Sequence, residues 1–428
     1  MVRKHTMRVL FSDAEYAIKQ AALASLESSL TPGLYAIFAQ FLEHERQLDP
    51  LPDAELLRLF DACSDPERST DELISILRTL SPGNGRVGYR QVNLLIDHLR
   101  TRIAQFMEVR HFFPHQLVPH DHVFGSGGDF FKTIHASTIS SIVVAPLLTI
   151  CKTGTNNVTS LHGSAQAMQQ IGYGTYDLNV EQVNAELRNS GFAFISLGAL
   201  GFPYSAQLKA AREYLWREAK QLFEAKCAVG KPGWQDAIQS TTIPLDIFKT
   251  VPLNAQVLYP QHHTTGVCAP GMLPYVLSIY LHLQSQGMIV YNYDSIDEVA
   301  NASSDPTPYA PNNLLLHVSA EEIALAECSP EDLGFARAEL SEIREEEDLD
   351  VVNDDFWNII SGRERGPKRD FIAANTAVLL VAAGQVPAES GDLIAQLRVG
   401  IKMVEDLIDS GRSEENFRHL LATHNQNH

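Results

Sequence analysis

Cysteine is scarce in this chain of 428 residues, which contains five cysteines and no C-x-x-C pair. Neither a disulfide framework nor a zinc site built from paired cysteines is therefore expected. No stretch approaches the roughly 18 apolar residues of a membrane span, and the first residues lack the apolar core of a secretory signal. These absences predict a cytoplasmic protein with no membrane partner.

Positive charge is also scarce, because 33 Lys and Arg stand against 52 Asp and Glu and give a formal net charge of -19. General nucleic-acid binders concentrate Lys and Arg in order to replace the counterions around phosphates. We therefore expect no nucleic-acid partner. Any phosphate that this protein binds must be held by a local site.

The front of the chain has the periodicity of amphipathic helices. Apolar residues return every three or four positions in 13–30 and 88–109, and again in 179–192 and 205–226. We predict a helical N-terminal domain over 1–118, completed by a later excursion of the chain over about 178–245. A charged run at 341–355 is expected to be a solvated acidic loop.

The remainder, 119–428, alternates β-rich runs with helical stretches. The β-rich runs are 140–154, 257–260 and 288–294, and a helical stretch follows at 274–286. This alternation predicts an α/β fold with a central sheet flanked by helices. The whole chain is thus expected to combine an α/β domain with an α-helical domain.

Three blocks could carry chemistry, and the first is a glycine-rich turn, GSGGD, at 125–129. Glycines let backbone N–H groups converge on one anion, and the dipole of a following helix adds to the same point. His135, Ser137 and Thr138 follow the turn, where such a helix could begin. Glycines also serve ordinary loops, so the turn alone does not establish a phosphate site.

The second block is a polar loop after a predicted buried strand that ends near Lys152. Open α/β sheets bind their ligands beside loops of this kind, at the carboxyl ends of the strands. The third block is the adjacent pair Asp297 and Glu298, which follows another predicted strand. Magnesium is bound by few carboxylates together with phosphate oxygens. A surface lysine and two solvated loop acids are the plain alternatives.

The order of these blocks resembles the anthranilate phosphoribosyltransferase family. The family's G-T-G-G-D turn, N-x-S-T helix start, K-H-G-N-R loop, G-S-A-D helix and D-E pair have counterparts in this chain. They are GSGGD at 125–129, HAST at 135–138, KTGTNN at 152–157, GSAQ at 163–166 and IDE at 296–298. Further similar stretches are 247–255, 264–267, 329–335 and 366–380. The resemblance runs in order from about 120 to 420.

The resemblance implies a fold of the nucleoside phosphorylase and phosphoribosyltransferase type, with phosphoribosyl pyrophosphate as donor, Mg²⁺ as cofactor and an aromatic amine or acid as acceptor. It also implies a homodimer. By the resemblance, Mg²⁺ is bound by Ser137, Asp297 and Glu298. Asn375 stands where the family has an asparagine, but we expect it to be structural. The residues that it implies in substrate binding are Gly125, Gly128, Asp129, His135, Ser137, Thr138, Lys152, Thr155, Ser160 and Ser164. Lys152 and Asp129 are expected to position the substrates, and no residue is expected to act as a nucleophile.

The chain departs from the family pattern mainly on the acceptor side. Thr153, Thr155 and Asn156 replace the loop's His, Asn and Arg, His135 replaces the helix-start Asn, and Gln166 replaces the acid of G-S-A-D. No arginine falls at the spacing expected for the anthranilate carboxylate, although Arg212 and Arg217 lie nearby. Residues 218–246 look inserted.

These departures leave several functions open. The chain could transfer phosphoribosyl to an acceptor other than anthranilate, or it could be an ordinary anthranilate phosphoribosyltransferase of tryptophan biosynthesis. A pyrimidine nucleoside phosphorylase shares the architecture but fits the glycine turn and the acidic pair less well. A binding or regulatory protein that has lost turnover is the alternative from another class.

Overall fold

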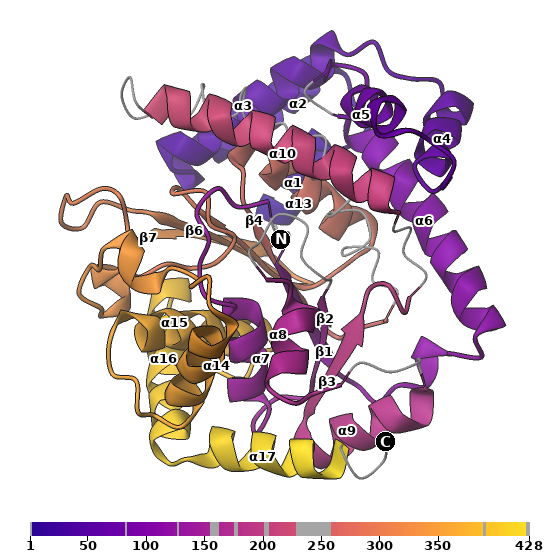
Figure 1. The fold of residues 1–428 in the computed structure, drawn as a ribbon. Coiled ribbons are helices and arrows are strands. Elements are labelled where there is room, and N and C mark those ends of the chain that lie inside the picture. The colour runs from indigo at the N-terminus through magenta and orange to yellow at the C-terminus, as the bar shows by residue number, and fades with distance from the viewer. Residues whose placement is uncertain are drawn as a thin grey trace.

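The computed structural model describes residues 2–81, 84–125, 128–154, 162–174, 179–200, 205–227, 258–387 and 391–424. A central sheet of seven strands runs through the molecule in the order β3-β2-β1-β4-β5-β6-β7 (Figure 1). The strands are β1 Asp121–Gly125, β2 Ile150–Gly154, β3 Phe192–Ser196, β4 His263–Val267, β5 Gly287–Asn292, β6 Asn313–Val318 and β7 Ile323–Cys328. The predicted fold class, a helix-flanked α/β sheet with a helical N-terminal region, is confirmed.

The first five strands in chain order are parallel, and β6 and β7 are antiparallel. The chain proceeds from β1 outward through β2 to β3, and then returns to place β4 on the other side of β1. The strand order therefore reverses between β1 and β4. In open α/β sheets, the carboxyl ends of the strands at such a reversal form the ligand-binding crevice.

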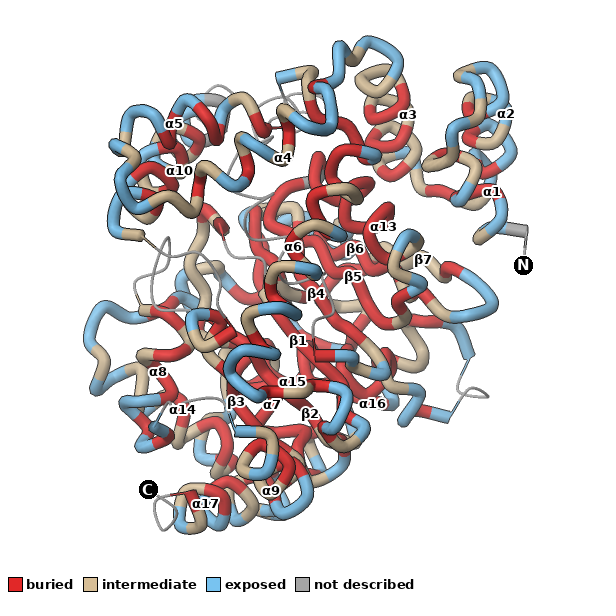
Figure 2. Tube along the Cα trace, turned by 90° about the vertical axis from the view of Figure 1, so that its right-hand side faces the viewer, coloured by how far each residue is buried: buried red, intermediate tan, exposed pale blue. Residues whose placement is uncertain are grey.

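Alternate residues of the central strands face two different cores, as the two-residue period of a strand requires. On β5, Ile289 and Tyr291 belong to one buried cluster, and Met288 and Val290 belong to the other. Figure 2 shows the resulting continuous burial of the sheet between its helical layers. Because both faces are covered, these strands read as apolar runs.

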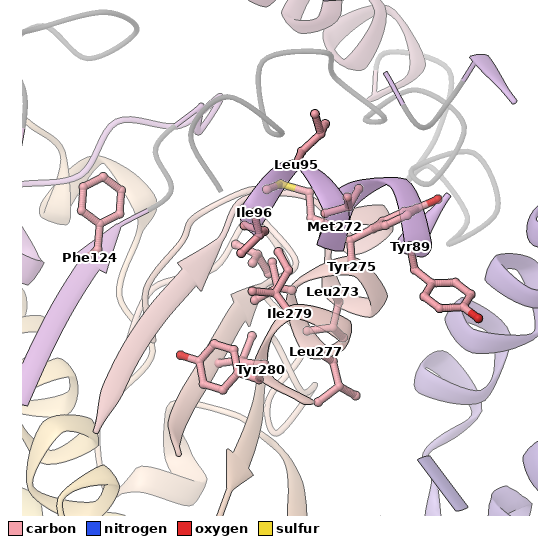
Figure 3. Packing of buried hydrophobic residues seen from close by; sticks show 14 of the residues in the cluster. Tyr89, Leu95, Ile96, Phe124, Met272, Leu273, Tyr275, Leu277, Ile279 and Tyr280 are labelled. Carbon is pink, nitrogen blue, oxygen red and sulfur yellow. The ribbon is translucent and has the colours of Figure 1, made fainter. Parts of the chain in front are cut away.

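The first face packs against the front of the chain. Its helices are α1 Val2–Leu10, α2 Tyr16–Leu26, α3 Pro32–Gln47, α4 Asp53–Ala62, α5 Thr70–Thr79, α6 Tyr89–Val109, α10 Ala206–Cys227 and α13 Leu273–His282. Local signals fix several of these helices: Pro32 stands in the first turn of α3, and Ser69 and Glu72 form a capping box on α5. Figure 3 shows Ile96 of α6 close to Ile279 of α13, and the same buried cluster includes Phe124 of β1.

The second face is covered mainly by the helices that follow the strands and by the end of the chain. These are α7 Ala136–Val144, α8 Ser164–Gln170, α14 Leu349–Ile360, α15 Pro367–Ala382, α16 Leu393–Asp409 and α17 Arg412–His424. The remaining helix, α9 Val180–Ser190, packs against β3 and α17. Buried residues occupy nearly the whole of α15, which is the central helix of this layer.

Three expectations from the sequence need correction. The run 140–154 is not one strand, because its first residues complete α7 and only Ile150–Gly154 pairs in the sheet. Leu258–Pro260 does not form a strand either, and the strand follows it as His263–Val267. The acidic stretch 341–355 is not a solvated loop: it contains the start of α14, and Glu345 within it is only 3% exposed.

Among the described helices, none combines the length and the apolar character that crossing a membrane requires.

Candidate active site

Two glycines at the ends of neighbouring strands make room for a carboxylate. Gly125 ends β1 and pairs in register with Gly266 of β4, next to the point where the strand order reverses. A Cβ atom on Gly125 would lie 2.8 Å from Oδ2 of Asp297, and one on Gly266 would lie 1.6 Å from the backbone oxygen of Asp297. Side chains at either position would displace Asp297, so the glycines permit its close approach to the strand ends.

The carboxylates at this point affect one another's charge. Burial, followed by the nearby charges of Asp297 and Asp129, raises the pKa of Glu298 well above its ordinary value. The hydroxyl of Thr133 donates to Oε2 of Glu298 at 3.3 Å. Asn375 holds the next residue, since its amide oxygen accepts from the backbone N–H of Val299 at 3.0 Å and its Nδ2 donates to the oxygen of Val299 at 2.9 Å. Asn375 therefore has the structural role expected of it.

Asp297 and Glu298 are residues that could hold Mg²⁺ together with a phosphate ligand. Within the described part of the chain, no three His, Cys, Asp or Glu side chains could hold a metal by themselves. Mg²⁺ is typically bound through one or two carboxylates plus substrate phosphates, so Asp297 and Glu298 fit it. A cation between them would also counteract the burial and the charge repulsion that together raise the pKa of Glu298.

Lys152 is a buried cation beside these acids. It lies on β2 with 1% of its surface exposed, and its Nζ donates to the backbone oxygen of Thr153 at 2.6 Å. The ammonium also lies 5.2 Å from the centre of the Phe124 ring. Burial lowers the pKa of Lys152 to about 8, while Asp297 and Glu298 act in the opposite direction. An anion bound beside this ammonium would therefore stabilise its charged form.

The start of α7 presents polar groups, as the sequence predicted. Ser137 and Thr138 lie in its first turn, and Thr138 is 2% exposed. The Thr138 hydroxyl has no hydrogen-bond partner among the residues that the structure describes. His135 precedes the helix, and burial lowers its pKa to about 4, with smaller contributions from His162 and Lys152. Backbone N–H groups and the helix dipole favour an anion at this point.

Glu345 closes one side of this helix start. Its Oε1 accepts from the backbone N–H of His162 at 3.1 Å and lies 3.2 Å from Nδ1 of the same residue and 3.4 Å from Nε2 of His135. Burial raises the pKa of Glu345. The next helix, α8, begins at Ser164, and the side-chain oxygen of Gln166 accepts from the N–H of Gly163 at 2.9 Å. Gln166 thus serves as a helix cap where the family pattern has an acid.

The side chain of Thr153 is buried and lies within hydrogen-bond distance of another core residue, His122. Its Oγ1 lies 2.8 Å from Nε2 of His122, and Nδ1 of His122 lies 2.8 Å from Nδ1 of His263 on the neighbouring strand. The two imidazoles stack with their ring centres 4.8 Å apart, and burial lowers the pKa of both. The substitution at position 153 therefore completes a buried polar row across β2, β1 and β4.

The structure brings most of the expected residues together at the strand ends. Gly125, Gly128 and Asp129 belong to the turn after β1, whereas Asp297 and Glu298 follow β5. Gly128 adopts a positive φ of +89°, which favours glycine. Of the remaining residues, Arg212 is buried in α10 and Arg217 pairs with Glu213. Ser126, Gly127, Thr155, Asn156, Ser160 and the stretch 247–255 lie outside the described residues.

Sequence reasoning missed a contact between α10 and the glycine turn. Nε1 of Trp216 donates to the backbone oxygen of Gly128 at 3.0 Å, across 88 positions of the chain. Lys132 and Lys220 place their ammonium groups 5.1 and 5.2 Å from the centre of the Trp216 ring. Glu345 was missed as well. No local signal identifies such contacts, because they join segments that are distant in sequence.

A family model described as the a/b domain of the glycosyl transferase family matches residues 120–217 and 247–414. An anthranilate phosphoribosyltransferase of Pelobacter propionicus is 25% identical over 301 residues, which cover 70% of this chain and 73% of the relative. That of Chromobacterium violaceum is 25% identical over 384 residues, which cover 87% of this chain and 97% of the relative. The resemblance stated from the sequence is confirmed.

Solved structures support the fold. The anthranilate phosphoribosyltransferase of Thermus thermophilus has a TM-score of 0.59 at 16% identity and covers 90% of this chain and 99% of its own. The Saccharomyces cerevisiae enzyme, solved in complex with PRPP and Mg, has a TM-score of 0.56 at 18% identity and covers 91% and 98%. Another structure of the yeast enzyme contains 4-fluoroanthranilate.

Proposed function

This chain belongs to the glycosyl transferase family defined by the a/b domain, and from that premise we propose that it transfers a 5-phosphoribosyl group. The donor is phosphoribosyl pyrophosphate, the acceptor is an aromatic amine or acid, and pyrophosphate leaves. The chain is an enzyme of the glycosyltransferase type. The family match supports the class of reaction, and the geometry of the site supports the choice of donor.

The observation that supports this donor most strongly is the convergence at the reversal of strand order. A glycine turn, the buried ammonium of Lys152 and the carboxylates Asp297 and Glu298 come from different strands and meet at one edge of the sheet. A ligand that satisfies all of them must carry several negative charges and chelate a divalent cation. A sugar with a pyrophosphate group has both properties.

The reaction needs positioning and charge stabilisation, and it needs no protein nucleophile. The bond between ribose C1 and the pyrophosphate oxygen breaks, its electron pair leaves with pyrophosphate, and an electron pair of the acceptor forms the new bond to C1. An acceptor amine then releases its proton. Lys152 would neutralise part of the phosphate charge, and the glycine turn would present N–H donors. Asp297, Glu298 and Ser137 would hold Mg²⁺, and a metal bound there would supply positive charge for the leaving pyrophosphate.

We propose that the acceptor is an aromatic molecule other than anthranilate. Thr153 is bound to His122 in the core, so this position of the loop does not contribute the histidine that the family pattern has. Arg212 is 3% exposed, and Arg217 pairs with Glu213. A carboxylate that enters a buried pocket without a cation is penalised by several kcal/mol. An acceptor with a smaller charge or a different substitution would avoid this penalty.

Pyrophosphate release tests the proposal. The protein is incubated with phosphoribosyl pyrophosphate, Mg²⁺ and a panel of aromatic acids and amines that includes anthranilate. We expect release with a subset of the panel and a low kcat/KM for anthranilate. Efficient turnover of anthranilate would instead assign the ordinary role in tryptophan biosynthesis. Donor binding without release for any acceptor would identify a binding or regulatory protein.

We also propose that the protein is a homodimer, as the resemblance implies. Light scattering coupled to gel filtration tests this directly, with a mass twice that of the 47.4 kDa chain expected.

A further inference from the structure

We propose that Lys132 and Lys220 bind the pyrophosphate end of the donor, and that Trp216 positions both the cations and the glycine turn for this purpose. The inference rests on the proposed function and adds residues to its site. It also gives the helical front of the molecule a part in donor binding, because Trp216 and Lys220 lie on α10, which packs against α5.

Trp216 joins α10 to the turn by a specific contact. Its indole N–H donates to the backbone oxygen of Gly128 at 3.0 Å, so the carbonyl of this turn residue is held toward α10. The ring also lies 6.5 Å from that of Phe130, centre to centre. A turn that has φ of +89° at Gly128 depends on such contacts to remain in one conformation. Fixing this carbonyl restricts the orientation of the peptide group between Gly128 and Asp129.

Two lysine ammonium groups lie next to the ring of Trp216. Lys132, from the segment between the turn and α7, has its Nζ 5.1 Å from the ring centre, and Lys220, one turn further along α10, has its Nζ at 5.2 Å. Both distances are typical of cation–π contacts. The Lys132 side chain is 13% exposed and lies 4.0 Å from Asp129, while that of Lys220 is 34% exposed and lies 3.8 Å from Glu224. The two ammonium groups thus gather around the indole that contacts the turn.

Charge balance explains why the turn needs these lysines. Asp129 is part of the turn and lies 4.0 Å from Lys132, and Oδ2 of Asp297 would lie 2.8 Å from a Cβ on Gly125, so carboxylates stand next to the turn and a pyrophosphate group would add further negative charge. The loop that follows Lys152 has Asn156 where the family pattern has arginine. A cation from elsewhere in the chain must then help to balance the ligand. Lys132 and Lys220 are the lysines that contact Trp216, which in turn contacts the turn.

The pyrophosphate end is assigned because of the position of the acids. A Cβ on Gly125, the first residue of the turn, would touch Oδ2 of Asp297, so the turn and the proposed Mg²⁺ ligands are adjacent. A pyrophosphate chelates Mg²⁺ through two phosphates, whereas a single sugar phosphate offers a weaker chelate. The ligand group nearest the turn and its lysines is therefore the pyrophosphate.

Calorimetry with inorganic pyrophosphate and Mg²⁺ tests the assignment, with ribose 5-phosphate as the second probe. The variants are Lys132→Ala, Lys220→Ala and the control Lys209→Ala. Lys209 lies on the same helix, is equally exposed at 34% and pairs with Glu213 at 3.7 Å, as Lys220 pairs with Glu224. We expect each of the first two changes to weaken pyrophosphate binding by about tenfold or more. Binding of ribose 5-phosphate and the control should be unaffected.

The outcomes separate this inference from the proposed function. If the unmodified protein binds neither pyrophosphate nor phosphoribosyl pyrophosphate, the proposed function fails. If it binds both and the three lysine variants behave alike, only the role of Lys132 and Lys220 is overturned. Weakened binding of ribose 5-phosphate by the same factor would place the lysines at the other end of the donor and would also overturn the assignment.

Fluorescence tests the part assigned to Trp216. In a Trp234→Phe, Trp357→Phe background, Trp216 is the remaining tryptophan. We expect pyrophosphate with Mg²⁺ to change its emission, because the neighbouring ammonium groups move onto the ligand. Replacement of Trp216 by Phe keeps a ring for the lysines but removes the N–H donor to Gly128, so pyrophosphate affinity should fall while the melting temperature changes little. An unchanged emission together with an unchanged affinity would contradict the positioning role.

Discussion

At the scale of single residues, Lys152 is the clearest case of a side chain retained at a cost to the fold. Burial lowers its pKa to about 8, so at neutral pH its charged form is less stable in the folded protein than in water. The nearby acids and one backbone oxygen offset only part of this cost. Such a lysine indicates a binding function in preference to a stabilising one.

Lys152→Met tests this interpretation. Methionine nearly matches the length and volume of lysine without its charge, so the free energy of unfolding should stay equal or increase. Donor affinity should fall by about 1.5–3 kcal/mol, the worth of a charge-assisted hydrogen bond. Calorimetry and chemical denaturation measure the two quantities. A destabilised protein that retains its donor affinity would show that Lys152 is structural. Alanine is less suitable, because it would leave a cavity.

Gly125 and Gly266 both lie beside Asp297, but we expect replacement by alanine to have different effects at the two positions. In Gly125→Ala the new methyl would lie 2.8 Å from a carboxylate oxygen that can rotate, so the fold should persist while Mg²⁺-dependent donor binding weakens. In Gly266→Ala it would lie 1.6 Å from a backbone oxygen, so the protein should lose stability. The control Gly198→Ala meets only a side-chain atom at 3.6 Å. Thermal melts and titrations compare all three, and similar behaviour of the first two would contradict the packing argument.

At the scale of elements, a half-buried acid joins α3 to α6 and α13. Glu45 of α3 accepts from the backbone N–H of Tyr89 and from the hydroxyl of Tyr275 on α13, each at 3.3 Å. Burial raises its pKa to about 7, and its hydrogen bonds and Lys19 counteract the effect only in part. The folded state therefore binds this proton more tightly than the unfolded state does.

The raised pKa of Glu45 makes the protein less stable as the pH rises. The pKa of Glu45 is raised on folding, so its contribution to stability is present below the ordinary value of 4.5 and is lost as the pH rises toward about 7. Glu45→Gln should remove the dependence, and wild type should lose up to about 3 kcal/mol more than the variant between pH 5 and pH 8. The control is Glu43→Gln on the same helix, since the pKa of Glu43 is lowered to about 2 and the group stays charged throughout. Equal slopes for wild type and Glu45→Gln would refute the assignment.

The elements also show which features the sequence could predict. The glycine turn, the start of α7 and the Asp297–Glu298 pair each lie within a short segment, so local chemistry made them candidates, and their order along the chain added the resemblance to a family. The strand expected over 140–154 failed in its first part because Ile142, Val143 and Val144 favour strands locally, whereas packing of α7 against α15 fixes them as helix. The Trp216–Gly128 and Glu345–His162 contacts join distant segments, so no local pattern reveals them.

At the scale of the whole molecule, the sheet separates two cores, and the candidate site lies at one edge of it. The helical front covers one face and the helices of the C-terminal part cover the other (Figures 1 and 2). The strand order reverses between β1 and β4, and Gly125 and Gly266 at the ends of these strands lie against Asp297. With a net charge of -19, the protein can bind a polyanion only where local groups and a divalent cation overcome the overall repulsion.

Metal-dependent donor binding is therefore the central claim, and one calorimetric titration tests it most directly. Phosphoribosyl pyrophosphate is titrated with and without Mg²⁺ into the wild-type protein and into the double variant Asp297→Asn, Glu298→Gln, whose folding is verified by its melting curve. The account predicts tight binding that requires Mg²⁺ in the wild type, and weak binding that does not respond to Mg²⁺ in the variant. Affinity that is the same in all four titrations, or no binding by the wild type, would contradict it.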